Sequence, residues 1–396
     1  MKAARQASSL LGSHLRELRE ETGFTLRDVE QATRALSEPI AFDALSRIET
    51  GQSLVSPEKI LVLSRVYHVP PQQFLDMLEL EQLGAGRAAP ADPETCMAEA
   101  NAAREKGDLR ETYATLRGGL VTLTARGIEG AADAEWAARF HINIGSTLRQ
   151  MGKHRAAQSH YEQALEYRTL PERLTAMALT GLSGIAYQMD RLRAAEGLAL
   201  AALKSARRTE EPHLIGLACL ELSNILEDLG SNHSALRFIR SAVEHLDRAP
   251  RCPQQVTARY NLGLRLEALG DTPGADAAWD EGLAAAGTFG DPRLRIRGLF
   301  ETGRAAFQRG DIPRAALRLR AGRDAAAARN LRAEQFHCAY FLWCLALRSG
   351  KADEARAWLA ELKPLRLLLD QRTEELLAFD QFIHQTRARK RARRPP

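Results

Sequence analysis

Apolar residues along this chain recur at helical spacing. Near the N-terminus, in residues 10–21, Leu11, Leu15 and Leu18 lie three or four positions apart, with charged residues between them. This spacing places the leucines on one face of an α-helix. Few runs of Val, Ile or Thr alternate with a period of two, so strands are not indicated. The pattern predicts an all-α protein.

A unit of helix, tight turn and helix repeats through three quarters of the chain. Its clearest copy is Ile144–Ala164, IGSTLRQMGKHRAAQSHYEQA. Gly152 supplies the turn, because glycine enters the positive-φ region without a Cβ penalty. The same turn position recurs along the chain, and its last five copies are 40 residues apart. These turn residues are Gly107, Gly152, Asp190, Gly230, Gly270, Gly310 and Gly350.

Small residues keep a fixed distance from each turn. Five positions after the turn stand Ala157, Ala195, Ala235, Ala275, Ala315 and Ala355. Twelve positions after it stand Ala164, Ala202, Ala242, Gly282 and Gly322. Seven positions before it stand Gly145, Ser183, Ser223, Gly263 and Gly303. Small residues on such a grid mark the places where two helices approach closely, so the sequence predicts stacked helical hairpins.

This grid, together with the YEQAL run at Tyr161–Leu165, resembles tetratricopeptide repeats. The resemblance covers roughly residues 93–365, and the period is longer than the usual 34 residues. It implies a right-handed α-solenoid of about seven hairpins with a groove lined by the first helix of each. The alternative is an alanine-rich helical bundle that is not a solenoid.

Residues before the repeats predict five short helices. Thr25–Glu30, Leu45–Gly51 (LSRIETG), Ser56-Pro57 and Leu63–Val69 resemble the Cro/repressor (XRE) type of helix-turn-helix. The segment from 34 to 42 departs from that pattern, because it is several residues longer than a tight turn. It leaves open where the third helix begins.

By this resemblance the third helix enters the major groove of DNA. If Leu45 and Ile48 face the core, Arg47 points outward and can bond guanine bidentately. The predicted DNA-binding residues are Thr25, Arg27, Phe42, Asp43, Ala44, Arg47 and Gln52. Two alternatives stay open: a surface ion pair of Arg47 with Asp43 or Glu49, and a purely capping role for Thr25.

In the repeats, Asn and Arg on the groove helices can hold an extended peptide, because an amide side chain offers a donor and an acceptor together. The predicted effector-binding residues are Arg139, Asn143, Asn224, Asn261, Arg297 and Arg304. Solvation of an open helix face is the alternative for each. A helix-turn-helix followed by such an array resembles the Rgg and PlcR class of regulators, which implies a homodimer and a peptide or protein effector.

Charge is unevenly distributed. Of the 55 Lys and Arg residues, six lie in the last ten positions, which leaves 49 against 50 Asp and Glu. Residues 1–86 hold nine basic and twelve acidic residues. This acidity weakens the case for non-specific phosphate binding. It keeps open an alternative function, a TPR adaptor whose helix-turn-helix contacts protein.

The remaining chemistry is sparse. Five cysteines share no ligand spacing, and no nucleotide-binding, metalloprotease or serine-hydrolase motif occurs. We therefore expect no enzyme activity, cofactor or metal site. No signal peptide or long apolar run is present, so we expect a cytoplasmic protein without membrane contact.

The predicted domains are a helix-turn-helix at 9–83, a linker at 84–92, the solenoid with its capping helix at 93–386 and a basic tail at 387–396. Aromatic residues crowd one late hairpin. We expect Leu331–Leu362, with the closing helix, to offer spare apolar surface to a second copy of the chain. The alternative is that these aromatic residues pack only against the closing helix.

Overall fold

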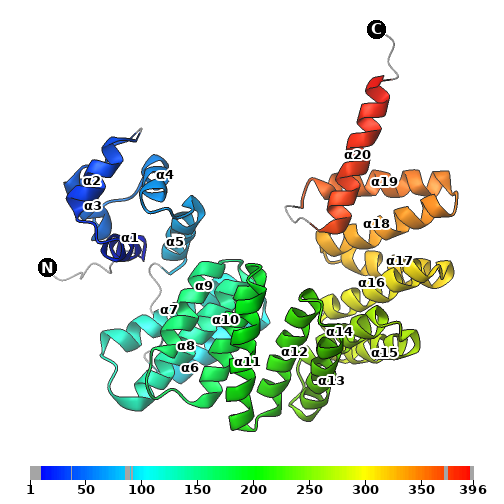
Figure 1. The fold of residues 1–396 in the computed structure, drawn as a ribbon, viewed down its shortest axis with the longest axis horizontal. Coiled ribbons are helices and arrows are strands. Elements are labelled where there is room, and N and C mark those ends of the chain that lie inside the picture. Colours follow the sequence, from blue (N-terminus) through cyan, green and yellow to red (C-terminus); the bar gives the residue numbers. More distant parts are fainter. Residues whose placement is uncertain (1–9, 37, 85–89, 91, 370–372, 393–396) are drawn as a thin grey trace. The chain divides into compact units, whose positions relative to one another are not determined.

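The computed structural model describes residues 10–36, 38–84, 90, 92–369 and 373–392. The N-terminal arm, most of the predicted linker and the end of the basic tail lie outside these residues, as do the side chains from 386 onward. Throughout the described part the regular secondary structure is helical (Figure 1). The chain divides into two compact units, residues 1–205 and 206–396.

The first five helices form the N-terminal domain, called the head below. Its helices are α1 (Leu10–Glu21), α2 (Leu26–Arg34), α3 (Phe42–Glu49), α4 (Pro57–Val66) and α5 (Pro71–Gly84). Side chains cap two of these helices: the Thr25 hydroxyl accepts from the Asp28 amide at the start of α2, and Ser56 caps α4 ahead of a proline at its first position. Val29, Leu63 and Phe74 lie in one buried cluster that forms the core of the head.

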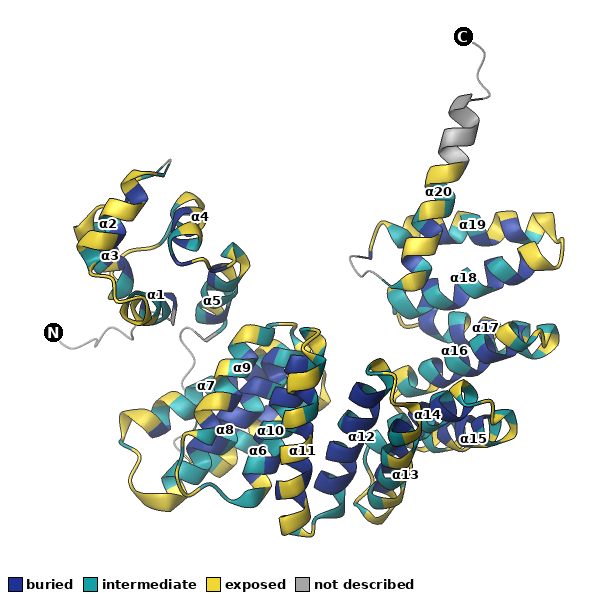
Figure 2. Ribbon diagram, in the orientation of Figure 1, coloured by how far each residue is buried: buried dark blue, intermediate teal, exposed yellow. Residues whose placement is uncertain are grey.

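Helical hairpins follow the head. Those that begin in the first unit are α6 (Pro93–Glu105) with α7 (Leu109–Ala125), α8 (Gly130–Gln150) with α9 (His154–Leu165), and α10 (Glu172–Gln188) with α11 (Leu192–Thr209). The boundary between the units falls within α11. Buried residues concentrate where the two helices of each hairpin meet (Figure 2).

The second unit continues the same pattern. Its hairpins are α12 (Pro212–Asp228) with α13 (Asn232–Arg248), α14 (Gln254–Ala268) with α15 (Thr272–Phe289), α16 (Pro292–Arg309) with α17 (Ile312–Ala327), and α18 (Arg332–Arg348) with α19 (Ala352–Arg366). Helix α20 (Glu374–Ala392) closes the described chain. Seven hairpins are thus present in the described residues, and the predicted all-α fold is confirmed.

The repeat grid has a direct structural cause. All seven turn positions have positive φ, including Asp190 at 59°, where the repeat lacks glycine. At Gly263 an added Cβ would come within 2.1 Å of the Trp279 ring, so only glycine fits there. Two of the small residues are serines, and the hydroxyl of Ser183 donates to the Ala195 carbonyl at 2.9 Å.

Late aromatic residues are covered within the chain. Phe336 and Trp343 are buried in one cluster with Phe379 of α20, at ring-centroid distances of 5.5 and 5.8 Å from it. Trp343 also contacts Phe382, 4.7 Å away. The expectation that the late hairpin leaves these rings uncovered for a second copy is wrong, because the closing helix packs over them.

Candidate DNA-binding face and effector groove

The outward face of α3 carries the predicted base-contacting residues. Leu45 and Ile48 are 3% and 2% exposed, so they anchor the helix in the core of the head. Phe42 is 41% exposed, and Asp43 and Arg47 are exposed beside it. Ala44 is half-buried, whereas Thr25, Arg27 and Gln52 are exposed on neighbouring segments. The structure therefore leaves all but Ala44 accessible.

The N-terminal caps of α2 and α3, the two helices of the helix-turn-helix, differ. The Thr25 hydroxyl donates to Asp28 Oδ2 at 2.7 Å and also accepts from the Asp28 amide, so its side chain is occupied by the cap. In contrast, the N-cap of α3 is Ala41, which offers no side-chain hydrogen bond. The first amides of α3 thus have no side-chain partner at the cap, and the positive end of its dipole favours an anion.

The long connection between α2 and α3 is anchored by a residue that sequence reasoning did not single out. Ile40 is 1% exposed, and its amide donates to the Thr33 hydroxyl at 3.0 Å. This buried contact fixes the chain two residues before Phe42. The longer segment is therefore compatible with a defined start for the recognition helix.

Glu49 is committed to the fold. Arg19 of α1 donates to its two carboxylate oxygens at 2.8 and 3.0 Å, and the Glu49 side chain is 7% exposed. The hydrogen bond between Arg19 and Glu49 raises the pKa of the Arg19 guanidinium. Such a bidentate pair orients α3 against α1. Glu49 is therefore occupied, and Arg47 forms no ion pair within the described chain.

A first groove of the array lies on α6, α8 and α10, the first helices of their hairpins, which are called the inner helices below. A cavity of about 360 Å³ is lined there by the apolar side chains Met97, Trp136 and Met177 and by the predicted Arg139 and Asn143. The Arg139 guanidinium lies 4.8 Å from the centre of the Trp136 ring, which is cation–π distance. The two predicted residues therefore meet beside an apolar, sulfur-rich lining.

Asn143 already uses both ends of its amide. Its Oδ1 accepts from Arg104 Nη2 at 3.0 Å, and its Nδ2 donates to the Arg139 carbonyl at 2.9 Å. Burial lowers the pKa of Arg104, and this guanidinium has no carboxylate partner among the described residues. A ligand main chain would have to exchange with these bonds. Arg104 was not among the predicted groove residues, because its partner lies 39 positions away.

The second unit brings three predicted residues into one hydrogen-bonded chain. Asn261 Nδ2 donates to Asn224 Oδ1 at 2.9 Å, and Arg297 Nη2 donates to Asn261 Oδ1 at 2.9 Å. Arg265, which was not predicted, donates to Asn224 Oδ1 at 3.0 Å and pairs with Glu227 at 2.7 Å. These hydrogen bonds connect side chains of three successive inner helices, α12, α14 and α16.

The sixth predicted residue lies apart from this chain. Arg304 pairs with Glu301 one turn away on its own helix at 2.9 Å. Beside Arg297 is a cavity of about 280 Å³, lined also by Phe300 and His337. The array thus presents two separate polar–aromatic grooves, one in each unit.

Among the described residues, no group of three or more metal-ligating side chains occurs. Within the same residues, no helix has the length and apolar character needed to cross a membrane.

Comparisons with known proteins agree with this arrangement. Residues 10–75 match the sequence profile of a helix-turn-helix domain, and residues 138–169 match that of a tetratricopeptide repeat. A search of curated proteins found no match.

Solved structures share the helical fold at low sequence identity. A Rap protein complexed with Competence and Sporulation Factor has 14% identity and a TM-score of 0.52, covering 90% of this chain and 98% of that one. The Rap conjugation gene regulator of the plasmid pLS20, in complex with the Phr* peptide, has 15% identity and a TM-score of 0.51, with 93% and 98% coverage. The apo form of RapI has 13% identity and a TM-score of 0.51, with 69% and 97% coverage. The chain therefore has a helix-turn-helix domain at residues 10–75 and a tetratricopeptide repeat at residues 138–169, within a helical fold that these Rap structures share.

Proposed function

We propose that this protein is a sequence-specific, DNA-binding transcriptional regulator whose array binds a peptide effector. The observation that carries the proposal is the α3 face. Phe42, Asp43 and Arg47 are exposed on it, its N-terminus lacks a side-chain cap, and Arg47 is free of ion pairs within the described chain. A helix presented in this way suits the major groove, where its first turns read base edges.

The acidity of the head is compatible with this role because of where the carboxylates lie. Asp76 and Glu79 of α5 pair with Lys153 of the array, and Glu81 accepts from the Leu11 amide. Without these three carboxylates, residues 1–86 would hold nine acidic and nine basic residues. The excess negative charge of the head is thus engaged in contacts away from α3.

The array grooves support a peptide ligand. Each combines amide and guanidinium groups with aromatic or sulfur-containing side chains, a mixture that suits main-chain hydrogen bonds together with apolar anchoring. Rap proteins of the same fold have been solved with Competence and Sporulation Factor and with the Phr* peptide. In this chain we assign effector contacts to Arg139 and Asn143 in one groove and to Asn261 and Arg297 in the other.

Dimerisation belongs to the same proposal. A single helix-turn-helix buries little surface on DNA, so two heads on paired half-sites give tighter specific binding. Three leucines near the α19–α20 connection remain exposed in the second unit: Leu367 at 87%, Leu368 at 64% and Leu377 at 49%. We assign the contact with a second copy to these leucines.

DNA binding is tested by titrating the protein against duplex fragments from upstream of its own gene at several salt concentrations. The proposal expects a saturable preference for one fragment and a salt dependence that reports several phosphate contacts. Equal, weak binding to every fragment would favour the adaptor alternative, in which the head contacts protein.

A further inference from the structure

Helix α5 belongs to two cores at once. Its first half contributes Phe74, fully buried, to the core of the head. Its second half contributes Leu80, 3% exposed, to a cluster that contains Tyr113 and Leu116 of the array, with Leu83 packed against it. The head is therefore joined to the first hairpins by an apolar anchor near the end of α5.

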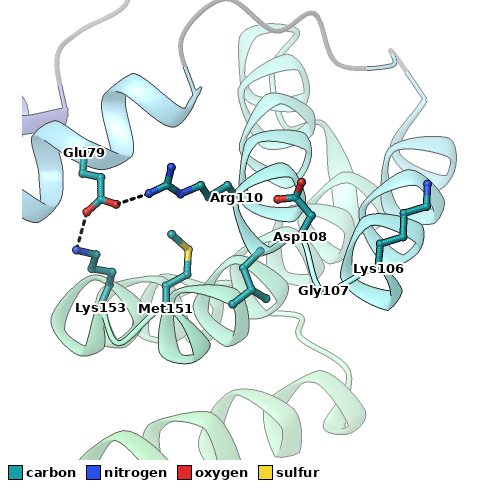
Figure 3. Close-up of a pocket in the computed structure, with 8 residues that line it drawn as sticks. Glu79, Lys106, Gly107, Asp108, Arg110, Met151 and Lys153 are labelled. Carbon is teal, nitrogen blue, oxygen red and sulfur yellow. Dashed lines mark ion pairs between the residues drawn. The ribbon is translucent and has the colours of Figure 1, made fainter. Parts of the chain in front are cut away.

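A polar contact lies within about one turn of that anchor, because Asp76 and Glu79 precede Leu80 by four residues and by one. Lys153 Nζ lies 2.7 Å from Asp76 Oδ1 and 2.8 Å from Glu79 Oε2, and its side chain is only 15% exposed. Arg110 approaches Glu79 from the other side at 3.7 Å (Figure 3). We call the bridge of Lys153 with these two carboxylates the clasp.

A second link strengthens the clasp. Arg155 Nη1 donates to Gln73 Oε1 at 2.7 Å, and Gln73 Nε2 lies 2.8 Å from His14 Nε2. Side chains thus connect α9 of the array through α5 to α1 of the head.

Lys153 is an unfavourable residue at the start of its own helix, α9. It is the N-cap of α9, where a side-chain oxygen would satisfy a free amide and where the helix dipole disfavours a cation. At the same position of three other hairpins, Asp108, Asp271 and Asp311 each cap their helix, whereas α19 has Lys351, which pairs with Glu354 on its own helix. The carboxylate partners of Lys153 lie instead on α5.

The clasp lies between two cavities. One of about 620 Å³ is lined by Glu79, Arg110 and Lys153, and another of about 230 Å³ is lined by Gln73 and Asp76. Water and ions therefore reach both sides of the contact, and salt weakens charge pairs that solvent can reach. The Leu80 anchor, being apolar and buried, is not weakened in this way.

We propose that the acidic face of α5 docks reversibly on the α8–α9 turn, with Leu80 as the pivot and the clasp as the contact that fixes the angle of the head. Helix α8 leads directly from the first groove to this turn, since Asn143 precedes Lys153 by ten residues. Displacement of α8 by a groove ligand would therefore act on the clasp. That last step rests on the proposed function, whereas the docking itself does not.

The angle of the head is measured by pulsed electron paramagnetic resonance between spin labels on unnatural amino acids. The labels replace Ser53 in the head and Ser159 on α9, both exposed. The parent should give one narrow distance distribution, which broadens in about 1 M salt, where the Debye length falls to about 3 Å.

Lys153→Ala should broaden the distribution in ordinary buffer. Lys351→Ala is the matched control, because Lys351 has the same place at the start of α19 and pairs only with Glu354 in the described chain. That control should stay narrow. If Lys153→Ala loses its helical circular dichroism, the isosteric pair Asp76→Asn and Glu79→Gln provides the same test from the other partner.

Charge exchange completes the design. Lys153→Glu should broaden the distribution, and adding Asp76→Lys with Glu79→Lys should narrow it again. A folded Lys153→Ala protein, or a folded Asp76→Asn and Glu79→Gln protein, with the parent's narrow distribution would overturn the proposal. The Leu80 anchor and the Arg155–Gln73 link would then hold the head without the clasp. Neither result depends on DNA binding, so failure here leaves the proposed function standing.

Discussion

The Arg47 guanidinium turns back along its own helix, where Nε donates to the Asp43 carbonyl at 3.2 Å. This bond holds the side chain along the exposed face of α3 and engages no carboxylate. The alternative of a surface ion pair with Asp43 or Glu49 is not what the structure shows, because Glu49 is taken by Arg19. Arg47 is therefore oriented at the surface, and no carboxylate among the described residues forms an ion pair with it.

Arg47→Ala is expected to weaken binding to the specific site by about 1–3 kcal/mol, the value of one bidentate guanine contact. Its thermal unfolding should match that of the parent, because the side chain is exposed. Arg65→Ala removes an equal charge from an exposed position of α4 and serves as the control. Equal losses for both variants would mean that Arg47 contributes charge alone and reads no base.

Ala235→Leu is expected to destabilise the array by about 1–3 kcal/mol through overpacking. Ala235 is fully buried, and its carbonyl accepts from the Ser223 hydroxyl at 3.0 Å, so the two helices have no room for a larger side chain. Denaturant unfolding measures the change. Ala284→Leu, at an exposed position of α15, should leave the midpoint unchanged. Equal unfolding midpoints for Ala235→Leu and Ala284→Leu would contradict a close approach of the two helices at Ala235.

A pair of contacting histidines, His141 buried and His160 half-buried, predicts acid sensitivity of the first unit. His141 Nδ1 and His160 Nδ1 lie 3.0 Å apart, so one ring donates to the other while both are neutral. Burial lowers the pKa of His141 to about 4 and that of His160 to about 3. An unfolded histidine has a pKa of about 6.5, so the unfolded chain takes up these protons first as pH falls.

The stability supplied by this neutral pair is therefore fully present above pH about 6.5 and is lost as pH falls toward 4. For His141, 9% exposed, the loss at pH 5 is about 2 kcal/mol. His141→Gln should flatten the pH dependence of urea unfolding between pH 7 and 5, whereas His233→Gln, at an exposed position, should not. Parallel pH profiles for all three proteins would refute the assignment.

The exposed leucines near the end of α19 predict where two copies of the chain meet in the dimer. Leu367→Glu combined with Leu368→Glu is expected to yield monomers, because it places two charges on the apolar surface assigned to the dimer contact. Light scattering measures the mass. Leu317→Glu, at a 70% exposed leucine of α17, is the matched control and should leave the dimer intact. A double variant that stays dimeric would place the interface elsewhere.

Much of the array could be predicted because its contacts are local and repeat. The two helices of each hairpin approach closely at the same positions, so the same small residues recur there. The turn at Asp190 could also be identified from its position in the repeat, although it lacks glycine. Contacts outside the repeat give no such signal. Lys153 meets Asp76 across 77 residues, and the Asn261–Asn224 bond depends on how successive inner helices stack. Ile40 was missed because a single apolar residue in a loop has no period.

The most direct test of the central claim is the capture of genomic fragments from the native host with the parent protein and, in parallel, with Arg47→Ala. The account predicts that the parent enriches a recurrent sequence made of two half-sites about 10 base pairs apart or a multiple of that spacing. It also predicts that the variant loses the enrichment at defined positions within each half-site. Fragments with no shared sequence, or the same sequence enriched equally by both proteins, would contradict it.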